Sequence, residues 1–459
     1  MPSRRSLLAA PALLAPAVAL AQAPAVQQDD VVAPGVQRNL LIRWGDRVTF
    51  DAPDFDPRRQ SAEAAGAQFG WDARIAGIIG SPVGSDRSAR AVLAVAHPDV
   101  RARMAFPGGV DRPDVAAAMQ GASLLNLERQ GGPRGGRWVV VEGGYQARRL
   151  TATTLCRASG PLADEAGAAL RGLLGVSGGV ATPWSTLLLT EGDTAPWVSR
   201  LGGLNPRAYG WVVELNALDP QSIPVKRTAL GRFPKADAAA AVTRDGRAVV
   251  FMAELGGRLF RFVSGAPAGS GDALDDGMLS VARNQGGRVT WLPLPQSRDP
   301  LADARAAGAS NFLGLAGLDW DGPRGRLLMA TAEGVLELRG EPGGEDGVLV
   351  LLGRVGPGQA EDVVADARGA VLAGTGSGGR VGLQAETLWR LEGGAATPLY
   401  GAPRGASIGG VAVAPDGTIL TAARHPGAEP NATFERPATR WPQFEPGAPP
   451  RSSIIALMG

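Results

Sequence analysis

An apolar run, a tight turn containing Asp and Gly, and a second apolar run recur along this chain. The pattern is clear in four places, at residues 239–255, 317–338, 361–375 and 410–423. Asp-Gly, or Asp followed closely by Gly, favours hairpin turns. Hairpins repeated over several hundred residues fit a propeller better than a sandwich. We therefore predict an all-β fold, a six-bladed β-propeller with short helical and loop insertions.

Three segments refine this prediction. The stretches "DRPDVAAAMQGAS" (residues 111–123) and "LADEAGAALRGLLG" (residues 162–175) have helical signals and are interpreted as insertions. The segment "RTALGRFPKADAAAAV" (residues 227–242) stands between two strand-like runs, so we expect a loop there. Near the C-terminus, "SSIIAL" (residues 452–457) is predicted to pair with the first blade and close the ring.

Composition limits the classes of partner. The 46 Lys and Arg residues nearly balance the 44 Asp and Glu residues. No dense basic run with interleaved aromatic residues occurs, so a nucleic-acid partner is not expected. No clear linker divides the chain, and we predict one propeller domain over residues 22–459.

The N-terminus has the features of an export signal. Arg4 and Arg5 precede an uncharged apolar run that ends in "ALA" at residues 19–21. This order predicts a signal peptide over residues 1–21, and the paired arginines favour the twin-arginine type. We therefore expect the twin-arginine export machinery as a partner and a periplasmic or secreted protein. Once the signal is removed, no membrane span is expected.

Chemistry-bearing motifs are few. Cys156 is the single cysteine, so an intramolecular disulfide is excluded, and its apolar setting predicts a buried structural thiol. "GTGSGG" (residues 374–379) matches a dinucleotide motif, but a strand-like run follows it, so we interpret it as a hairpin loop and expect no such cofactor. His97 and His425 are too few for a three-histidine metal site, which leaves open an oxygen-ligand site for a hard cation.

Long blocks of the chain resemble the PhoX-type alkaline phosphatases, which are secreted bacterial propeller enzymes. The resemblance is most specific in "YGWVVELNALDPQSIPVKRTALGRF" and in "RDGRAVVFMAELGGRLFRFVSG". Further blocks follow in the family's order, among them "AVLAVAHPDVRARMAFPGG", "GVSGGVATPWSTLLLTEGD", "LDDGMLSVARNQGGRVTWLPL" and "GGVAVAPDGTILTAARHPGA".

This resemblance implies a cluster of iron and calcium ions at one axial end of the propeller. In the family, acidic side chains bind the ions, a cysteine bridges the irons, and the cluster hydrolyses phosphomonoesters. Such cations polarise phosphoryl oxygens and activate an oxygen nucleophile. Several carboxylates are needed because closely packed cations repel one another unless anionic ligands neutralise them.

Several positions depart from the family pattern where the resemblance implies metal ligands. The bridging cysteine falls on Val176, and of a Glu-Glu pair Glu191 remains while the second falls on Gly192. His97 is kept, but a neighbouring glutamate falls on Pro98. At two further places, Lys235 and Ala236 stand where the family has His-Glu, and Ala253, Glu254 and Leu255 stand where it has Gly-Asp-Asp. Later in the chain, Ala360, Glu361 and Asp362 stand where the family has Pro-Asp-Gly, and an expected glutamate falls near Ser407.

Three hypotheses remain open. In the first, the chain is an altered phosphatase that acts on a small phosphoester, with calcium at Glu191, Glu254 and Glu361. Iron is not expected in it, because a valine cannot bridge two irons. Its catalytic candidates are Arg232 and Lys235 as phosphate contacts, together with His97. In the second, it is a non-catalytic propeller that binds a ligand or a protein. In the third, it is a calcium-dependent hydrolase of the lactonase type.

Overall fold

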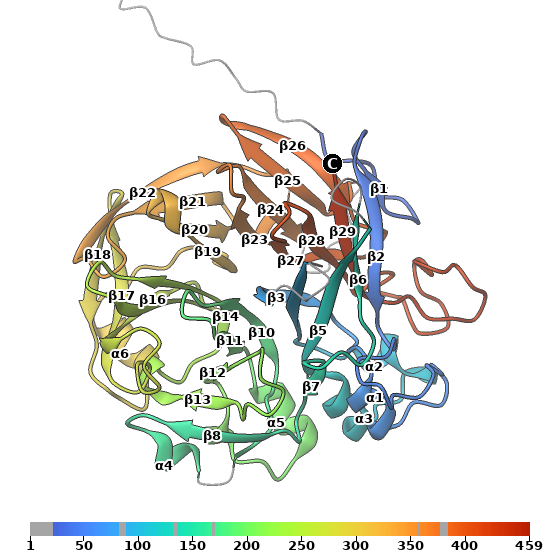
Figure 1. Ribbon diagram of the computed structural model, residues 1–459, viewed down its shortest axis with the longest axis horizontal. Helices are drawn as coiled ribbons and strands as arrows, with labels where there is room; N and C mark the ends of the chain where they lie inside the picture. Colours follow the sequence, from blue (N-terminus) through green and yellow to red (C-terminus); the bar gives the residue numbers. More distant parts are fainter. Residues whose placement is uncertain (1–21, 82–88, 132–135, 168–169, 357, 377–383) are drawn as a thin grey trace, which may run out of the picture.

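The computed structural model describes residues 22–81, 89–131, 136–167, 170–356, 358–376 and 384–459. Within them, antiparallel strands follow one another in groups of four around a common centre (Figure 1). Arg4 and Arg5 of the predicted signal lie outside the described residues, as does part of the "GTGSGG" motif.

Six such groups follow one another around the ring. The first is β3 (Arg74–Ser81), β4 (Arg90–His97), β5 (Gly121–Gln130) and β6 (Arg137–Val140), with β7 (Arg148–Leu150) paired to β5. The second is β10 (Val176–Ala181), β11 (Leu187–Glu191), β12 (Val212–Leu215) and β13 (Val225–Arg227), extended by β8 (Leu155–Ser159) and β9 (Leu170–Arg171). The third is β14 (Lys235–Val242), β15 (Arg247–Glu254), β16 (Leu259–Pro267) and β17 (Gly277–Gln285), followed by β18 (Arg288–Pro293).

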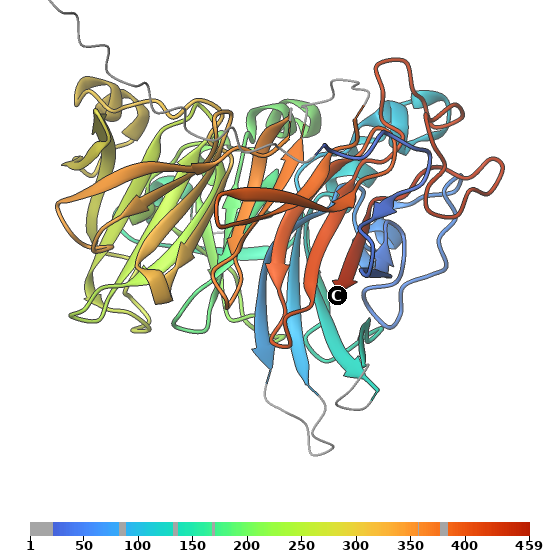
Figure 2. The ribbon, with the colours of Figure 1, turned by 90° about the horizontal axis from the view of Figure 1, so that it is seen from above.

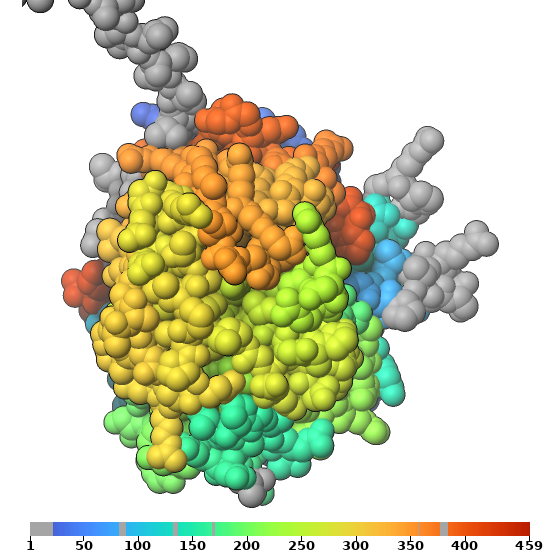
Figure 3. Space-filling model, turned by 90° about the vertical axis from the view of Figure 1, so that its left-hand side faces the viewer, coloured from blue at the N-terminus to red at the C-terminus, as the bar shows by residue number. Residues whose placement is uncertain are grey.

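The fourth group is β19 (Gly317–Asp321), β20 (Arg326–Thr331), β21 (Gly334–Arg339) and β22 (Asp346–Gly353). The fifth is β23 (Gln359–Ala365), β24 (Val371–Gly376), β25 (Thr387–Glu392) and β26 (Ala395–Gly401), with β1 (Val31–Val32) on its edge. The sixth is β27 (Ser407–Val413), β28 (Ile419–Arg424), β29 (Ser453–Met458) and β2 (Gln37–Arg43). The outer strands β18 and β22 also pair, which joins the third and fourth groups on the side of the molecule seen in Figure 3.

The first strand of each group lies at the centre of the ring. Around the circle, β3 contacts β10, β10 contacts β14, and the contacts continue through β19, β23 and β27 back to β3. This closed circle of inner strands confirms the predicted all-β propeller. The blade count stays a prediction, with which the six groups agree.

The two ends of the chain meet in one group. β29 lies between β28 and β2, so a strand from the C-terminus pairs with a strand from the N-terminal part. Ile454 and Ile455 on β29 are fully buried. A strand from the N-terminal part thus pairs with "SSIIAL" as predicted, but this strand, β2, belongs to the sixth group and not to the first.

The segment over residues 227–242 was expected to be a loop, and this expectation is wrong for its second half. Residues 235–242 form β14, the innermost strand of the third group. Its alanines alternate between two cores: Ala239 and Ala241 face the fourth group, whereas Ala238 faces the second. Small side chains fit there because neighbouring inner strands approach closely near the axis.

Helices are short and lie between strands. They are α1 (Ala62–Ala67), α2 (Ala102–Ala105), α3 (Pro113–Met119), α4 (Ala163–Ala166), α5 (Ala195–Leu201) and α6 (Pro300–Ala306), with 3-10 turns η1 (Pro107–Gly109), η2 (Pro206–Ala208), η3 (Thr228–Leu230) and η4 (Gly322–Arg324). Both predicted helical insertions contain a helix, α3 and α4. Pro at the first position and Asp114 in the first turn favour α3. In the described part of the chain, no helix has the length and apolar character to cross a bilayer.

Cys156 belongs to the core of the first two groups, with 2% of its surface exposed. Burial raises the pKa of its thiol to about 11, so the thiol stays protonated near neutral pH. The prediction that this thiol is buried is confirmed.

Candidate functional site

The predicted site residues gather where the inner strands begin. Val176, Lys235 and Ser407, at positions where the resemblance implies metal ligands, are the first residues of β10, β14 and β27, and Glu361 is near the start of β23. In Figure 2, β3 (blue) runs away from the end of the ring that carries α5 (green) and α6 (gold). The candidate site is therefore the axial end nearest these helices.

An arginine that the sequence analysis did not single out stands on the axis. Arg74 Nε and Nη2 both donate to Oδ1 of Asp362, at 3.0 and 2.6 Å. Arg74 Nη2 also lies 3.5 Å from Oδ2 of Asp237. We call these three residues the axial cluster. Burial raises the pKa of Asp237 to about 7, partly offset by Arg74 and reinforced by the Asp362 charge.

A second arginine–carboxylate group lies beside the axial cluster. Asp72 accepts from Arg424 through both oxygens, Oδ1 from Nε at 3.0 Å and Oδ2 from Nη2 at 2.8 Å. Burial opposes ionisation of Asp72, but Arg424 outweighs it and holds the pKa of Asp72 below its ordinary value. Glu361, a predicted metal ligand, lies 4.0 Å from Arg424 Nη1, and burial raises its pKa. A guanidinium therefore faces this carboxylate.

Glu191 was also predicted as a metal ligand, and all of its hydrogen-bonding capacity is taken by the protein. Oε1 accepts from Lys226 Nζ at 2.9 Å and from the N–H of Leu174 at 3.0 Å. Oε2 accepts from the N–H groups of Gly210 at 2.9 Å and Trp211 at 3.0 Å. The Lys226 and Glu191 side chains are both 0% exposed.

Glu254, the third predicted metal ligand, stabilises its own hairpin. Oε1 accepts from the N–H of Gly256 at 2.7 Å. Oε2 accepts from Arg258, from the backbone at 3.3 Å and from Nη1 at 3.2 Å. These bonds close the turn between β15 and β16, which is a structural role for this carboxylate.

Lys235 was predicted to contact phosphate, but the structure encloses it completely. Its Nζ donates to the carbonyls of Gly210 and Gly231 at 2.9 Å and of Phe233 at 3.0 Å. It also lies 3.9 Å from the centre of the Phe233 ring. Burial lowers the pKa of Lys235 to about 7. With its three donors used and 0% of its surface exposed, Lys235 cannot reach a bound phosphoester in this arrangement.

Arg232 remains partly exposed, yet it too bonds to backbone. Nε donates to the carbonyl of Tyr209 at 3.0 Å and Nη2 to that of Pro206 at 2.9 Å. Burial lowers its pKa. Two of its donor nitrogens thus hold the turn before β12 in place.

His97, the remaining catalytic candidate, is buried in a polar contact network. Nε2 lies 2.7 Å from the Ser123 hydroxyl, and Nδ1 contacts the carbonyl of Asp72. Ser123 also accepts from Arg149 Nη1 at 3.0 Å. Burial and the Arg149 charge lower the pKa of His97 well below its ordinary value, so the imidazole is neutral. This environment is typical of a structural histidine.

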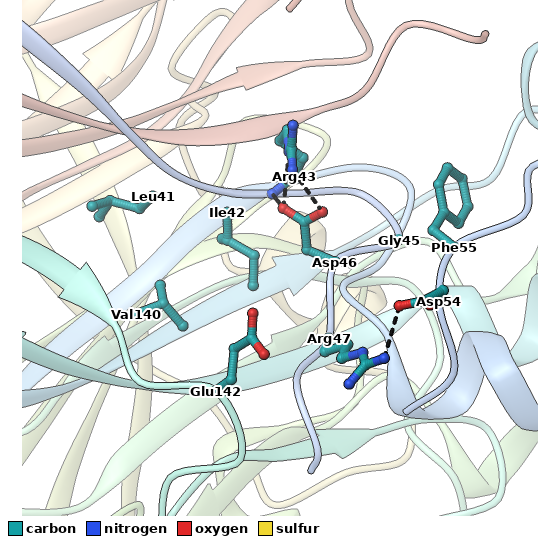
Figure 4. A pocket seen from close by; sticks show the side chains of 10 residues that line it. All are labelled: Leu41, Ile42, Arg43, Gly45, Asp46, Arg47, Asp54, Phe55, Val140 and Glu142. Atoms are coloured by element: carbon teal, nitrogen blue, oxygen red, sulfur yellow. Dashed lines mark hydrogen bonds and ion pairs between the residues drawn. The ribbon is translucent and has the colours of Figure 1, made fainter. Parts of the chain in front are cut away.

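A surface pocket lies away from the axis, beside the outer strands β2 and β6 (Figure 4). Its volume is about 330 Å³. Two ion pairs line it, Arg43 with Asp46 at 3.0 Å and Arg47 with Asp54 at 2.7 Å. Glu142 also lines the pocket, whereas none of the predicted site residues does.

The family model described as alkaline phosphatase PhoX matches residues 19–335. This chain belongs to the PhoX family. Among solved structures, PhoX of Pseudomonas fluorescens, in complex with the transition-state analogue vanadate, has a TM-score of 0.83 and 22% identity, covering 95% of this chain and 97% of that chain. This likeness shows the shared PhoX fold.

Two other solved structures are far less similar. A gluconolactonase of Xanthomonas campestris has a TM-score of 0.34 and 10% identity, covering 93% of this chain and 99% of that chain. A protein of unknown function from Dyadobacter fermentans has a TM-score of 0.41 and 12% identity, covering 93% and 100% of the two chains. A comparison with curated proteins gives no match.

The residues present do not fit the iron and calcium cluster that PhoX membership implies. Val176, at the position of the bridging cysteine, is a fully buried apolar residue. Glu191 is saturated by Lys226 and three backbone N–H groups. Across the described residues, His, Cys, Asp and Glu form no group of three or more that could hold a metal ion. Glu191, Glu254 and Glu361 therefore do not form a common calcium site there.

Proposed function

We propose that this chain is an exported PhoX-family propeller that binds a ligand or a protein and does not hydrolyse phosphomonoesters with metal ions. The observation that carries the proposal is the buried pair of Lys226 and Glu191. Glu191 is the glutamate that remains from the family's Glu-Glu ligand pair, and here it has an ammonium in place of a metal ion.

The electrostatics of the axial end support this proposal. A metal ion bound at Glu191 would have to displace the Lys226 ammonium or lie beside it, and like charges in a poorly solvated site repel strongly. Arg424, which is bound to Asp72, also lies 4.0 Å from Glu361. Positively charged side chains therefore lie next to carboxylates that would have to be free to bind metal ions in the family's phosphatase reaction.

Retention of the fold favours binding as the remaining role. In the described residues, buried apolar clusters fill the space between neighbouring groups of strands, as expected of a propeller scaffold. Loops at the axial end of such a scaffold commonly carry binding residues.

A phosphatase assay tests the proposal. The mature protein, purified from its native export route, is incubated with 4-nitrophenyl phosphate in the presence of calcium and iron salts. We expect no hydrolysis above the buffer rate. Metal-dependent turnover that is lost in Glu191→Gln, but kept in a control variant of an exposed glutamate, Glu392→Gln, would overturn the proposal.

A further inference from the structure

The guanidinium of Arg74 is bound by oxygen atoms from several strands at once. Nη1 donates to the carbonyls of Ser177 on β10 and Ala236 on β14, both at 2.9 Å. Nη2 reaches the carbonyl of Ala316, just before β19, at 3.2 Å, and that of Glu361 on β23 at 3.4 Å. When the bonds to Asp362 are included, every nitrogen of the Arg74 side chain donates to at least one oxygen acceptor.

The two carboxylates of the axial cluster extend these links to the rest of the ring. Asp362 Oδ2 accepts from the N–H of Gly410 on β27 at 2.7 Å. Asp237 accepts from the N–H of Gly179 on β10 and of Leu318 on β19, both at 3.1 Å. All six inner strands of the described ring are thus connected to one guanidinium, directly or through one carboxylate.

The backbone around the axial cluster is shaped to bring these oxygens inward. At Gly317, an added Cβ would lie 2.6 Å from the carbonyl oxygen of Glu361. At Gly178, an added Cβ would clash with the Asp237 carboxylate. The two glycines allow the close approach that places carbonyl and carboxylate oxygens around the Arg74 side chain.

We propose that the propeller axis is a binding site for one planar organic cation, and that the Arg74 guanidinium is its built-in occupant. Two buried carboxylates and four inward carbonyls create a negative potential that requires a cation. A guanidinium matches this set because it offers five donors in one plane. This inference goes beyond the proposed function, since it identifies the axial cation whether or not the chain binds a ligand elsewhere.

Chemical rescue tests the proposal. Arg74→Ala leaves the carboxylates without their cation, so its melting temperature should fall by several degrees below that of the unmodified protein. Methylguanidinium at low millimolar concentration should restore part of this loss, whereas equal potassium chloride should not. In Arg74→Ala combined with Asp237→Asn and Asp362→Asn, methylguanidinium should have no effect. Absence of selective rescue, or equal rescue in the triple variant, would overturn the proposal.

A second measurement applies if Arg74→Ala does not fold. The unmodified protein is unfolded in urea and refolded with and without a metal chelator. A resident guanidinium predicts the same recovered fraction and the same melting temperature in both samples. A melting temperature that falls with the chelator and is regained with calcium would show that a metal ion, and not Arg74, holds the axis.

Discussion

Lys226 Nζ lies 2.9 Å from Oε1 of Glu191, and neither side chain has any solvent-exposed surface. Lys226 is on β13 and Glu191 ends β11, so the pair joins two strands of one group across β12. Lys226 also donates to the carbonyl of Ala208 at 2.8 Å. The ion pair thus links β11 and β13 near the axial end of the ring.

Lys226→Met should destabilise the fold strongly. It leaves Glu191 as a buried carboxylate without its cation, and breaking such a pair costs about 3–5 kcal/mol. Urea unfolding measures the change. Lys226→Met combined with Glu191→Gln should recover part of the loss, because the buried charge is then gone. A single variant as stable as the unmodified protein would contradict the importance of this pair.

Asp237→Asn should change how stability depends on pH. The folded pKa of Asp237 is raised to about 7 from an ordinary 3.8. The folded state therefore binds the proton more tightly, and this stabilisation is complete below about pH 4 and is lost as the pH rises to about 7. Relative to Asp237→Asn, the free energy of unfolding of the unmodified protein should fall by up to about 4 kcal/mol across this range. Parallel pH profiles for the two proteins would contradict the prediction.

Lys235→Met should show the opposite trend at higher pH. The folded pKa of Lys235 is lowered to about 7 from an ordinary 10.5, so the unfolded chain binds more protons between these values. The unmodified protein should therefore gain stability relative to Lys235→Met as the pH rises from 7 toward 10. Melting curves of both proteins at intervals across this range measure the difference. A constant difference would show that Lys235 keeps its ordinary pKa.

Ile454→Ala should weaken closure of the ring. Ile454 is fully buried on β29, between β28 and β2, and loss of such a side chain costs about 2–5 kcal/mol. Val348→Ala on the outer strand β22 is a suitable control, because Val348 is 57% exposed. If both variants unfold at the same urea concentration, β29 does not close the ring in the way proposed.

Export should depend on the N-terminal arginines. Replacement of both Arg4 and Arg5 by Lys should retain the protein in the cytoplasm with residues 1–21 still attached, because the twin-arginine route reads this pair. N-terminal sequencing of the exported, unmodified protein should begin at Gln22. Export of the double-lysine variant at the normal level would indicate a different route.

The hairpins were predictable from the sequence because the Asp-Gly turns that make them are local. β14 was not predicted, because what makes this segment a strand is its position in the fold and not a local sequence pattern. Its alanines have low intrinsic strand preference, and only their position next to the axis makes small side chains favourable there.

The pairs that define the axial end could not be read from spacing. Arg74 meets Asp237 and Asp362 across 163 and 288 residues of sequence, and Lys226 meets Glu191 across 35. Two local signals were nevertheless present. Arg74 is a charged residue at the start of an otherwise apolar strand, and Asp237 interrupts an alanine run. Both patterns indicate a buried charge that needs a partner.

The metal content of the mature protein tests the central claim most directly. The protein is purified from its native export route without chelators, and iron and calcium are measured by mass spectrometry of the elements together with the protein concentration. If positively charged side chains take the place of metal ions at the axial end, the measured iron and calcium contents should each be far below one ion per chain. Stoichiometric iron and calcium that are lost in Glu191→Gln would contradict the account.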